Sequence, residues 1–160
     1  MILQKPALDP KTVEPRINSG NPEPYRSRVT PREKRQLGKE LGLTKIGVNQ
    51  TTLPPGKESS MRHWHTHEEE FIYVLSGEVV LRTDLGEQVL TAGMCAGFAI
   101  GPDKLRGDGH QLINRGAVPA VYLEMSNRDP LDEGWYSEAD LRWNAPDARG
   151  IFTRKDGSKF

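Results

Sequence analysis

The sequence predicts an all-β domain, folded as a sandwich or a barrel of short antiparallel strands. Its 160 residues suit one compact domain. From residue 45 onward, runs rich in β-branched and aromatic residues alternate with glycine turns at short spacing. The chain contains 16 glycines and 12 prolines and shows no long helical pattern, so we expect no helices between these strands.

Residues 1–44 are expected to form a proline-rich arm that precedes the barrel. Six of the twelve prolines lie within the first 31 residues, where their fixed backbone angle and missing donor disfavour a regular helix or a central strand. We therefore expect an extended arm that wraps the domain or a partner subunit. One short helix is predicted from Pro31 to about Leu41, because Thr30 suits its N-cap and Gly42 suits its end.

Residues 45–126 are expected to form the barrel. Alternation along the run EFIYVL directs Ile72 and Val74 inward and Phe71 and Tyr73 outward. The predicted strands are KIGVNQTTL, EFIYVL, EVVLRTD, EQVL, CAGFAI, HQLIN and AVYLEMS.

Residues 127–160 are expected to form a C-terminal tail that packs on the barrel. Trp135, Tyr136 and Trp143 are interpreted as the anchors that dock this tail. A short helix is predicted from Ser137 to Leu141, and the ending GIFTRKDGSKF is predicted to add one edge strand.

Composition argues against several classes of function. The 22 basic and 22 acidic residues cancel, and a neutral chain without a basic stripe is a poor candidate for binding nucleic acid. Residues 1–45 carry 10 Lys/Arg against 5 Asp/Glu, an excess that we interpret as a solvated surface. No signal-peptide core or membrane-length apolar run is present, so we expect a soluble, cytoplasmic protein with no membrane partner. The single cysteine, Cys95, permits no disulfide within the chain and is expected to be buried.

The histidines suggest a metal site. Three of the four, His63, His65 and His67, lie within five residues, and the fourth, His110, begins a predicted strand. Residues two apart on a strand share a face, so His63 and His65 present two imidazoles to one side. The acidic run Glu68-Glu69-Glu70 follows, and we expect Glu68 and Glu69 to be solvated turn charges. Imidazole with carboxylate suits Fe, Mn, Ni, Co, Zn or Cu. The alternatives are surface histidines, or a site that has lost its metal.

The spacing of these residues resembles the two conserved motifs of the cupin superfamily. The first motif is matched by Gly56, His63, His65, Glu70 and Gly77. The second motif is matched more weakly, by Gly93, His110 and Asn114. The sequence departs from the second motif at Ala99, where the family has proline, and in a longer segment before His110.

This resemblance implies a fold, a metal site and an assembly. The fold would be a cupin-type β-barrel, that is, a double-stranded β-helix or jelly roll, with the extended N-terminal arm and short helical pieces outside it. His63, His65, Glu70 and His110 would bind one divalent first-row transition metal, namely Fe, Mn, Ni, Co or Zn. Many cupins are dimers, so a homodimer is expected, and deletion of residues 1–30 should weaken it if the arm crosses to the partner.

The runs LGLTKIGVNQTTLPPG and FTRKDGS are also similar to those of small bacterial cupins labelled as sugar phosphate isomerases. The resemblance implies a metal-dependent isomerase that acts on a sugar or a sugar phosphate. The candidate proton-transfer residues are His67, Glu124 and Tyr122. The candidate substrate-binding residues are Lys104, Arg106 and Gln111, with Arg115 as a further cation for a phosphate. The alternatives without a functional role are a surface histidine for His67 and ordinary solubility charges for Lys104 and Arg106.

Two other functions fit the same residues. One is an Fe(II)-dependent dioxygenase, because the donor set suits iron equally well. The other is a cupin that binds a small ligand without turnover. Iron dependence with oxygen consumption would distinguish the first, and ligand binding without reaction would distinguish the second.

Overall fold

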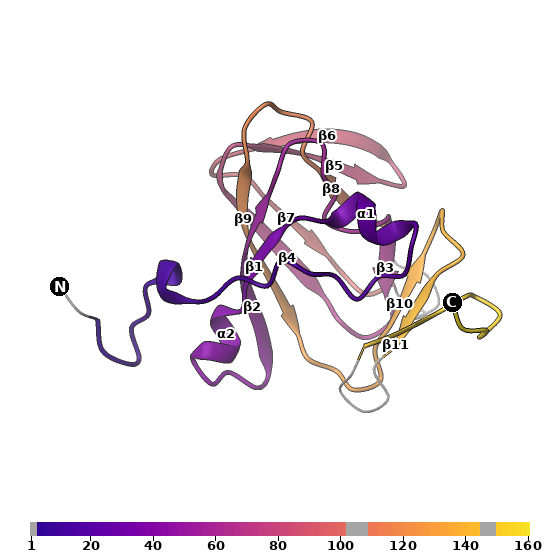
Figure 1. Ribbon diagram of the computed structural model, residues 1–160, viewed down its shortest axis with the longest axis horizontal. Coiled ribbons are helices and arrows are strands. Elements are labelled where there is room, and N and C mark those ends of the chain that lie inside the picture. The colour runs from indigo at the N-terminus through magenta and orange to yellow at the C-terminus, as the bar shows by residue number, and fades with distance from the viewer. Residues whose placement is uncertain (1–2, 102–108, 145–149) are drawn as a thin grey trace.

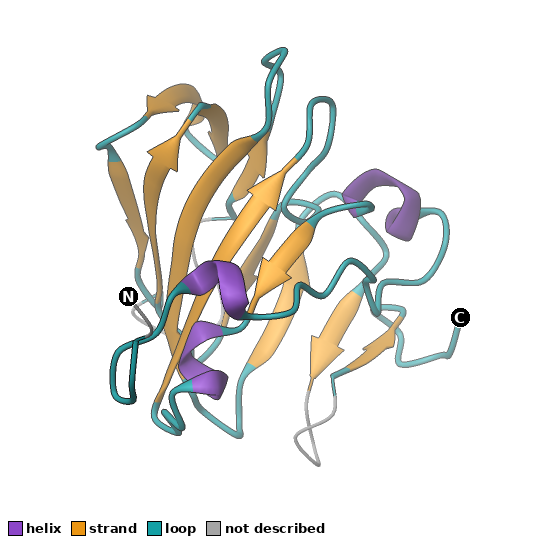
Figure 2. Ribbon diagram, turned by 60° about the vertical axis from the view of Figure 1, so that its left-hand side comes forward, coloured by secondary structure: helices purple, strands orange, loops and turns teal. Residues whose placement is uncertain are grey.

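The computed structural model describes residues 3–101, 109–144 and 150–160, and within them the chain is almost entirely β-structure (Figures 1 and 2). This confirms the predicted all-β class. None of the helices in the described ranges is long and apolar enough to span a membrane. The helical elements are η1 (Pro10–Thr12), α1 (Tyr25–Val29) and α2 (Leu37–Glu40). The strands are β1 (Glu33–Arg35), β2 (Ile46–Leu53), β3 (His63–His65), β4 (Glu70–Ser76), β5 (Glu78–Thr83), β6 (Gly86–Thr91), β7 (Cys95–Phe98), β8 (Gln111–Ile113), β9 (Ala120–Asn127), β10 (Glu133–Tyr136), β11 (Arg142–Asn144) and β12 (Ile151–Thr153).

Antiparallel pairing joins these strands into three sheets. The five-stranded sheet runs in the order β1-β2-β9-β4-β7, the three-stranded sheet β6-β5-β8, and the four-stranded sheet β12-β11-β10-β3. Strands far apart in sequence lie side by side, since β2 pairs with β9 along its whole length. Such pairing of non-consecutive strands is typical of a jelly roll.

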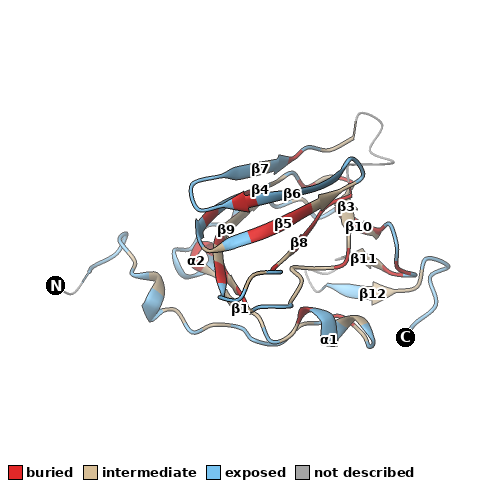
Figure 3. Cartoon of the chain, turned by 90° about the horizontal axis from the view of Figure 1, so that it is seen from above, coloured by how far each residue is buried: buried red, intermediate tan, exposed pale blue. Residues whose placement is uncertain are grey.

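The main core lies between the five-stranded and three-stranded sheets (Figure 3). Ile72 and Val74 of β4 are buried there with Leu81 of β5. Phe71 and Tyr73 point the other way and are 37% and 39% exposed. The inward and outward faces predicted for this strand are therefore confirmed. Glu70, the first residue of β4, lies on the same face as Ile72 and Val74.

A second core joins the C-terminal segment to the barrel. Val29 of α1, Met61 and Leu141 are almost fully buried in it, and Trp143 and Phe152 pack against it. The strand β10 pairs with β3, and β12 forms an outer edge of that sheet, as the sequence predicts. The C-terminal segment thereby lies against one side of the strand that carries two of the histidines.

The helix predicted from Pro31 to Leu41 is largely wrong. Residues Glu33–Arg35 instead form β1, which pairs with the edge of β2, and only the short helix α2 follows. Thr30 does not begin a helix, because it closes α1: its hydroxyl donates to the carbonyl of Arg26 at 2.8 Å. Pairing with the barrel has overridden the local helix signal.

Two smaller predictions are also wrong. Residues 137–140 form bends rather than a helix, and Glu138 there accepts hydrogen bonds from Arg62 and Arg82 at 3.2 and 2.9 Å. Cys95 is exposed, because it begins β7 at the edge of the five-stranded sheet with its side chain outward.

Candidate metal centre and adjoining cavity

Two of the histidines lie on β3. His63 and His65 face one side of this strand, while Trp64 faces the other and stacks on Trp135 of β10 at a centroid distance of 6.3 Å. The backbone of His63 also exchanges two hydrogen bonds with His110, at 2.8 and 3.1 Å. The third histidine is therefore brought to the same place by strand pairing rather than by proximity in sequence.

Glu70 completes the cluster from the start of β4. Its Oε2 atom lies 2.7 Å from Nε2 of His110, 3.5 Å from Nε2 of His65 and 3.8 Å from Nε2 of His63. Three imidazole nitrogens thus converge on one carboxylate oxygen inside the barrel.

Packing fixes the orientation of the rings. Nδ1 of His63 donates to the carbonyl of Met61 at 3.0 Å, and since a carbonyl only accepts, Nε2 keeps its lone pair in the neutral ring. The same ring stacks on Tyr136 at 5.4 Å. The ring of His110 lies flat against Phe98, with centroids 3.7 Å apart. These contacts direct Nε2 of both rings towards Glu70.

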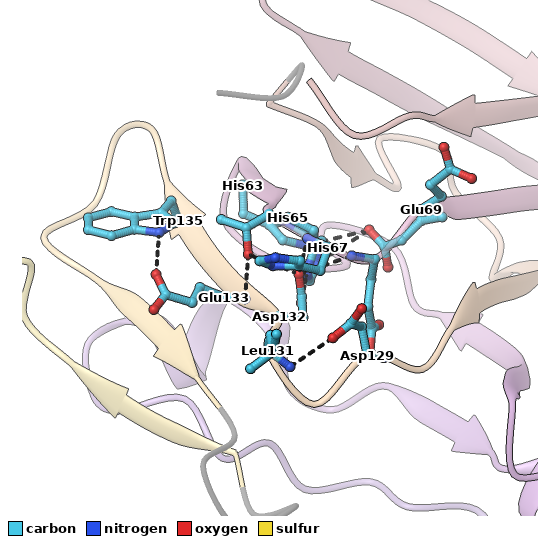
Figure 4. Close-up of polar contacts among 12 residues, drawn as sticks. His63, His65, His67, Glu69, Asp129, Leu131, Asp132, Glu133 and Trp135 are labelled. Atoms are coloured by element: carbon cyan, nitrogen blue, oxygen red, sulfur yellow. Dashed lines mark hydrogen bonds and ion pairs between the residues drawn. The ribbon is translucent and has the colours of Figure 1, made fainter. Parts of the chain in front are cut away.

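Asp132 holds the third ring and the turn behind it (Figure 4). This side chain is fully buried, and its Oδ2 atom lies 2.6 Å from Nδ1 of His65. Its Oδ1 atom accepts from the backbone amides of His67 and Glu68 at 2.8 and 3.1 Å. One carboxylate therefore orients His65 and closes the turn that leads to Glu70.

The charges in the cluster act strongly on one another. Burial, with the imidazoles of His110 and His65, lowers the pKa of His63 to about 3. Burial also opposes protonation of His65, but the Glu70 and Asp132 carboxylates outweigh it and raise the pKa of His65 to about 9. Burial tends to raise the pKa of Glu70, yet the three imidazoles hold it well below its usual range. Glu70 is thus an ionised carboxylate whose Oε2 atom is buried, a state that requires positive charge nearby.

The residues present fit a first-row metal ion. The ligand atoms of His63, Glu70 and His110 all lie within 4.8 Å of one another, and Nε2 of His65 is within 3.5 Å of Glu70. Ligands bound at about 2.0–2.2 Å from one ion lie roughly 3 Å apart, which matches this spacing. Imidazole and carboxylate donors suit this class of metal, and a bound ion would take the place of the proton on His65. A second group, His65, Glu68 and Asp132, meets the same distance criterion but shares His65 with the first.

The cluster forms one wall of a cavity of about 310 Å³. Glu124 and Tyr122 of β9 also line this cavity, so the structure brings two of the predicted proton-transfer residues to the cluster. Glu124 forms an ion pair with Lys34 and accepts from Asn49 at 3.1 Å and from Thr51 at 3.2 Å. Burial and the Glu124 charge raise the pKa of Tyr122, so its phenol stays protonated.

Of the described residues among the other predictions, His67 and Gln111 do not line this cavity. His67 lies in the turn after β3 with its Nδ1 atom 2.8 Å from the Thr66 hydroxyl. Gln111 is buried, and its amide donates to Glu58 and to the Ser60 carbonyl, at 2.9 and 2.7 Å, so its side chain braces a loop; its contact with a substrate stays a prediction.

Three cations were expected to bind a phosphate, and the structure describes one of them. Arg115 is exposed and forms a bidentate ion pair with Glu87, at 2.6 and 2.7 Å, away from the cavity. Lys104 and Arg106 lie outside the described residues.

Several site residues are missed by the sequence. Glu68, expected to be solvated, is only 9% exposed and lines the cavity, where burial and Asp132 raise its pKa. Asp132 carries no motif that would single it out. Arg32 and Lys34 of the arm also line the cavity, and the basic excess of residues 1–45 was their one sequence signal.

Relatives with the same fold carry names that bear on this site. A solved structure from Silicibacter pomeroyi, described as a sugar phosphate isomerase from a cupin superfamily, is 37% identical with a TM-score of 0.89, over 97% of this chain and 96% of that chain. A structure from Acidithiobacillus ferrooxidans, provisionally named a sugar phosphate isomerase, is 26% identical with a TM-score of 0.70, over 82% of this chain and 83% of that chain.

A curated relative comes from polyketide biosynthesis. The tetracenomycin polyketide synthase protein TcmJ of Streptomyces glaucescens is 33% identical over 94 residues. The match spans 58% of this chain and 58% of TcmJ, so the chain covers less than two thirds of that relative. Residues 49–126 also match the Cupin domain family. With its near full-length likeness to a solved cupin, the chain belongs to the cupin superfamily.

Proposed function

We propose that this cupin is a metal-dependent isomerase of a phosphorylated sugar. The observation that carries the proposal is the composition of the cavity, in which the His/Glu cluster, the Glu124 carboxylate and several basic side chains surround one space of about 310 Å³. A metal site, a base and cations for a phosphate are the three features that such a reaction needs. The names of two relatives support the same substrate class.

In this proposal His63, His65, Glu70 and His110 bind one divalent first-row metal ion. Four protein ligands leave open positions on an ion that takes five or six, as at a catalytic site. When bound, the ion would polarise a substrate carbonyl or hydroxyl oxygen. The His65 ring, held by Asp132, is the ligand whose orientation is most firmly fixed.

Glu124 is proposed as the base and Tyr122 as a neutral hydrogen-bond donor. The isomerisation moves one proton from the hydroxyl-bearing carbon to the carbonyl carbon and one proton from that hydroxyl to the former carbonyl oxygen, so no oxidant or reductant is consumed. The carboxylate of Glu124 forms an ion pair with Lys34, so the proposed base lies beside a cation in the cavity wall. The protonated phenol of Tyr122 remains available to donate to a substrate oxygen.

The test begins with metal content, by mass spectrometry on protein purified without an affinity tag. The protein is then loaded with Zn, Mn, Fe, Co or Ni and incubated with aldose phosphates in D2O. Formation of the ketose phosphate with deuterium at the carbon that gains the proton would support the proposal. The H63A/H65A variant should lose both the metal and the activity. Absence of any interconversion with every metal would overturn it, and oxygen consumption by the iron form would indicate a dioxygenase instead.

A further inference from the structure

The N-terminal arm brings basic side chains to the cavity. Arg16 and Lys34 form a two-hydrogen-bond backbone bridge at 2.9 Å, and Lys34 belongs to β1 on the edge of the five-stranded sheet. Arg16, Arg32 and Lys34 all line the cavity, and Arg128 after β9 joins them there. The arm is therefore part of the site wall and not only a surface segment.

These cations differ in how they are neutralised. Lys34 is paired with Glu124, so its charge is balanced within the cavity. Arg32 is half-buried, and in the part of the chain that the structure describes it has neither an ion pair nor a hydrogen bond through its side chain. A half-buried guanidinium keeps part of its hydration, and its five N–H groups remain available to a ligand in the cavity. An anion from solution is the natural partner for such a group.

Arg32 shares the cavity with two buried tyrosines. Tyr122 and Tyr136 are both buried and both line the cavity beside the His/Glu cluster. Burial raises the pKa of each phenol, and the Arg32 charge acts on both in the opposite sense. Arg32 lines the same cavity as Tyr122, Tyr136 and Glu124.

We infer that Arg32, assisted by Arg16 at the cavity rim, binds the phosphate monoester of the substrate. The inference rests on the proposed function, since it names the group that holds the phosphorylated end of the sugar. A guanidinium binds a phosphate through two parallel N–H···O bonds, and a phosphate monoester carries a charge between about −1.5 and −2, which more than one cation can share. The arm thus selects phosphorylated over neutral substrates.

The test measures binding of inorganic phosphate to the metal-loaded protein by titration calorimetry. The R32Q variant should bind phosphate about ten- to hundredfold more weakly, because charged hydrogen bonds of this kind are lost. R32K keeps the charge without the planar fork and should fall between R32Q and the wild type. K11Q removes one exposed arm charge that does not line the cavity, and its affinity should be unchanged.

Equal phosphate affinity in R32Q and in the wild type would overturn the inference, and so would acetate binding as tightly as phosphate. This result is independent of turnover. If phosphate binding depends on Arg32 but no sugar phosphate reacts, the anion site stands and the isomerase proposal fails. If sugar phosphates react and R32Q leaves both kcat/KM and phosphate affinity unchanged, the isomerase proposal stands and the anion site fails.

Discussion

Asp132 is the residue on which the geometry of the candidate site depends most, although it makes no contact with the cavity of its own. One of its oxygens is 2.6 Å from Nδ1 of His65, and the other accepts two backbone amides of the turn that follows. The charge of His65 holds the pKa of Asp132 below its usual range against the effect of burial. This carboxylate–histidine arrangement fixes the ring and strengthens it as a ligand.

Asp132→Asn is therefore expected to weaken metal binding about ten- to hundredfold, because the neutral amide supports His65 less well. Competition with a coloured chelator measures the affinity. Glu69→Gln, on an exposed side chain of the same turn, is the control and should leave the affinity unchanged. Equal metal affinity in the Asp132→Asn protein would show that His65 does not need this partner.

Glu124→Gln is expected to separate chemistry from metal binding. Loss of a general base typically costs about a hundredfold to ten-thousandfold in kcat, whereas the metal content should stay the same, since Glu124 is not a proposed ligand. Steady-state kinetics beside metal analysis gives both quantities. Glu87→Gln, which removes only an exposed ion pair with Arg115, should change neither. Full activity in Glu124→Gln would assign the proton transfer to another group.

The sequence predicts the residues that act through spacing, and it misses those that act through the fold. His63, His65, Glu70 and His110 were selected by motif, and the structure brings all four together. Asp132 reaches the site from the predicted C-terminal tail, and Arg32 reaches it from a segment that the sequence predicts to be helical. Their placement depends on strand pairings that no local pattern encodes.

Gly56 and Gly77 of the first cupin motif both lie in turns that need a positive φ angle. Gly77, between β4 and β5, has φ +71°, and a Cβ added there would meet the carbonyl oxygen of Pro119 at 2.9 Å. Gly56 has φ +74° in open space. Both positions disfavour a side chain because of their backbone angle, and only Gly77 also lacks room for one.

Gly77→Ala should consequently destabilise the protein more than Gly56→Ala. The backbone angle costs roughly 1–2 kcal/mol at either position. The clash with Pro119 adds about 1–3 kcal/mol at Gly77 alone. Denaturant unfolding of the two variants measures the difference, and equal losses would mean that the neighbouring loop moves aside.

Some secondary-structure elements could also be predicted from the sequence, and others could not. The alternation of β4 was predictable because one face is buried and the other is not, so the period of two is visible in the residues. The segment 31–41 was not, because its proline and capping residues satisfy a helix start locally while β1 gains its hydrogen bonds from β2. Short elements at the edge of a sheet are decided by their partner strand.

For the whole molecule we propose a homodimer. Residues 3–15 extend away from the barrel and have no buried side chain (Figures 1 and 3). On the barrel, Phe71 and Tyr73 leave an exposed aromatic strip on the outer face of β4. An extended arm and an apolar sheet face are both suited to contact with a second copy of the chain.

Deletion of residues 1–15 is expected to weaken this dimer, measured by light scattering over a range of concentrations. A deletion of residues 1–30 would be less informative, since Val29 is fully buried in the second core. The shorter deletion also spares Arg16, so metal content and thermal unfolding at a fixed protein concentration serve as controls on the fold. A monomeric full-length protein, or an unchanged dimer after deletion, would contradict the proposal.

Because β10 pairs with β3, we expect an ion bound to the histidines of β3 to stabilise the C-terminal sheet. If β10 separates from β3, the histidine strand loses its register, so opening of this sheet and release of metal should be one cooperative event. An ion present at a hundred times its dissociation constant would stabilise the closed form by about 2.7 kcal/mol. Amide hydrogen exchange in β10 and β11 should then slow about a hundredfold on metal loading, with little change in the distant β6. Hydrogen exchange in β10 and β11, which carry no proposed ligand, would then measure how much of the protein has metal bound.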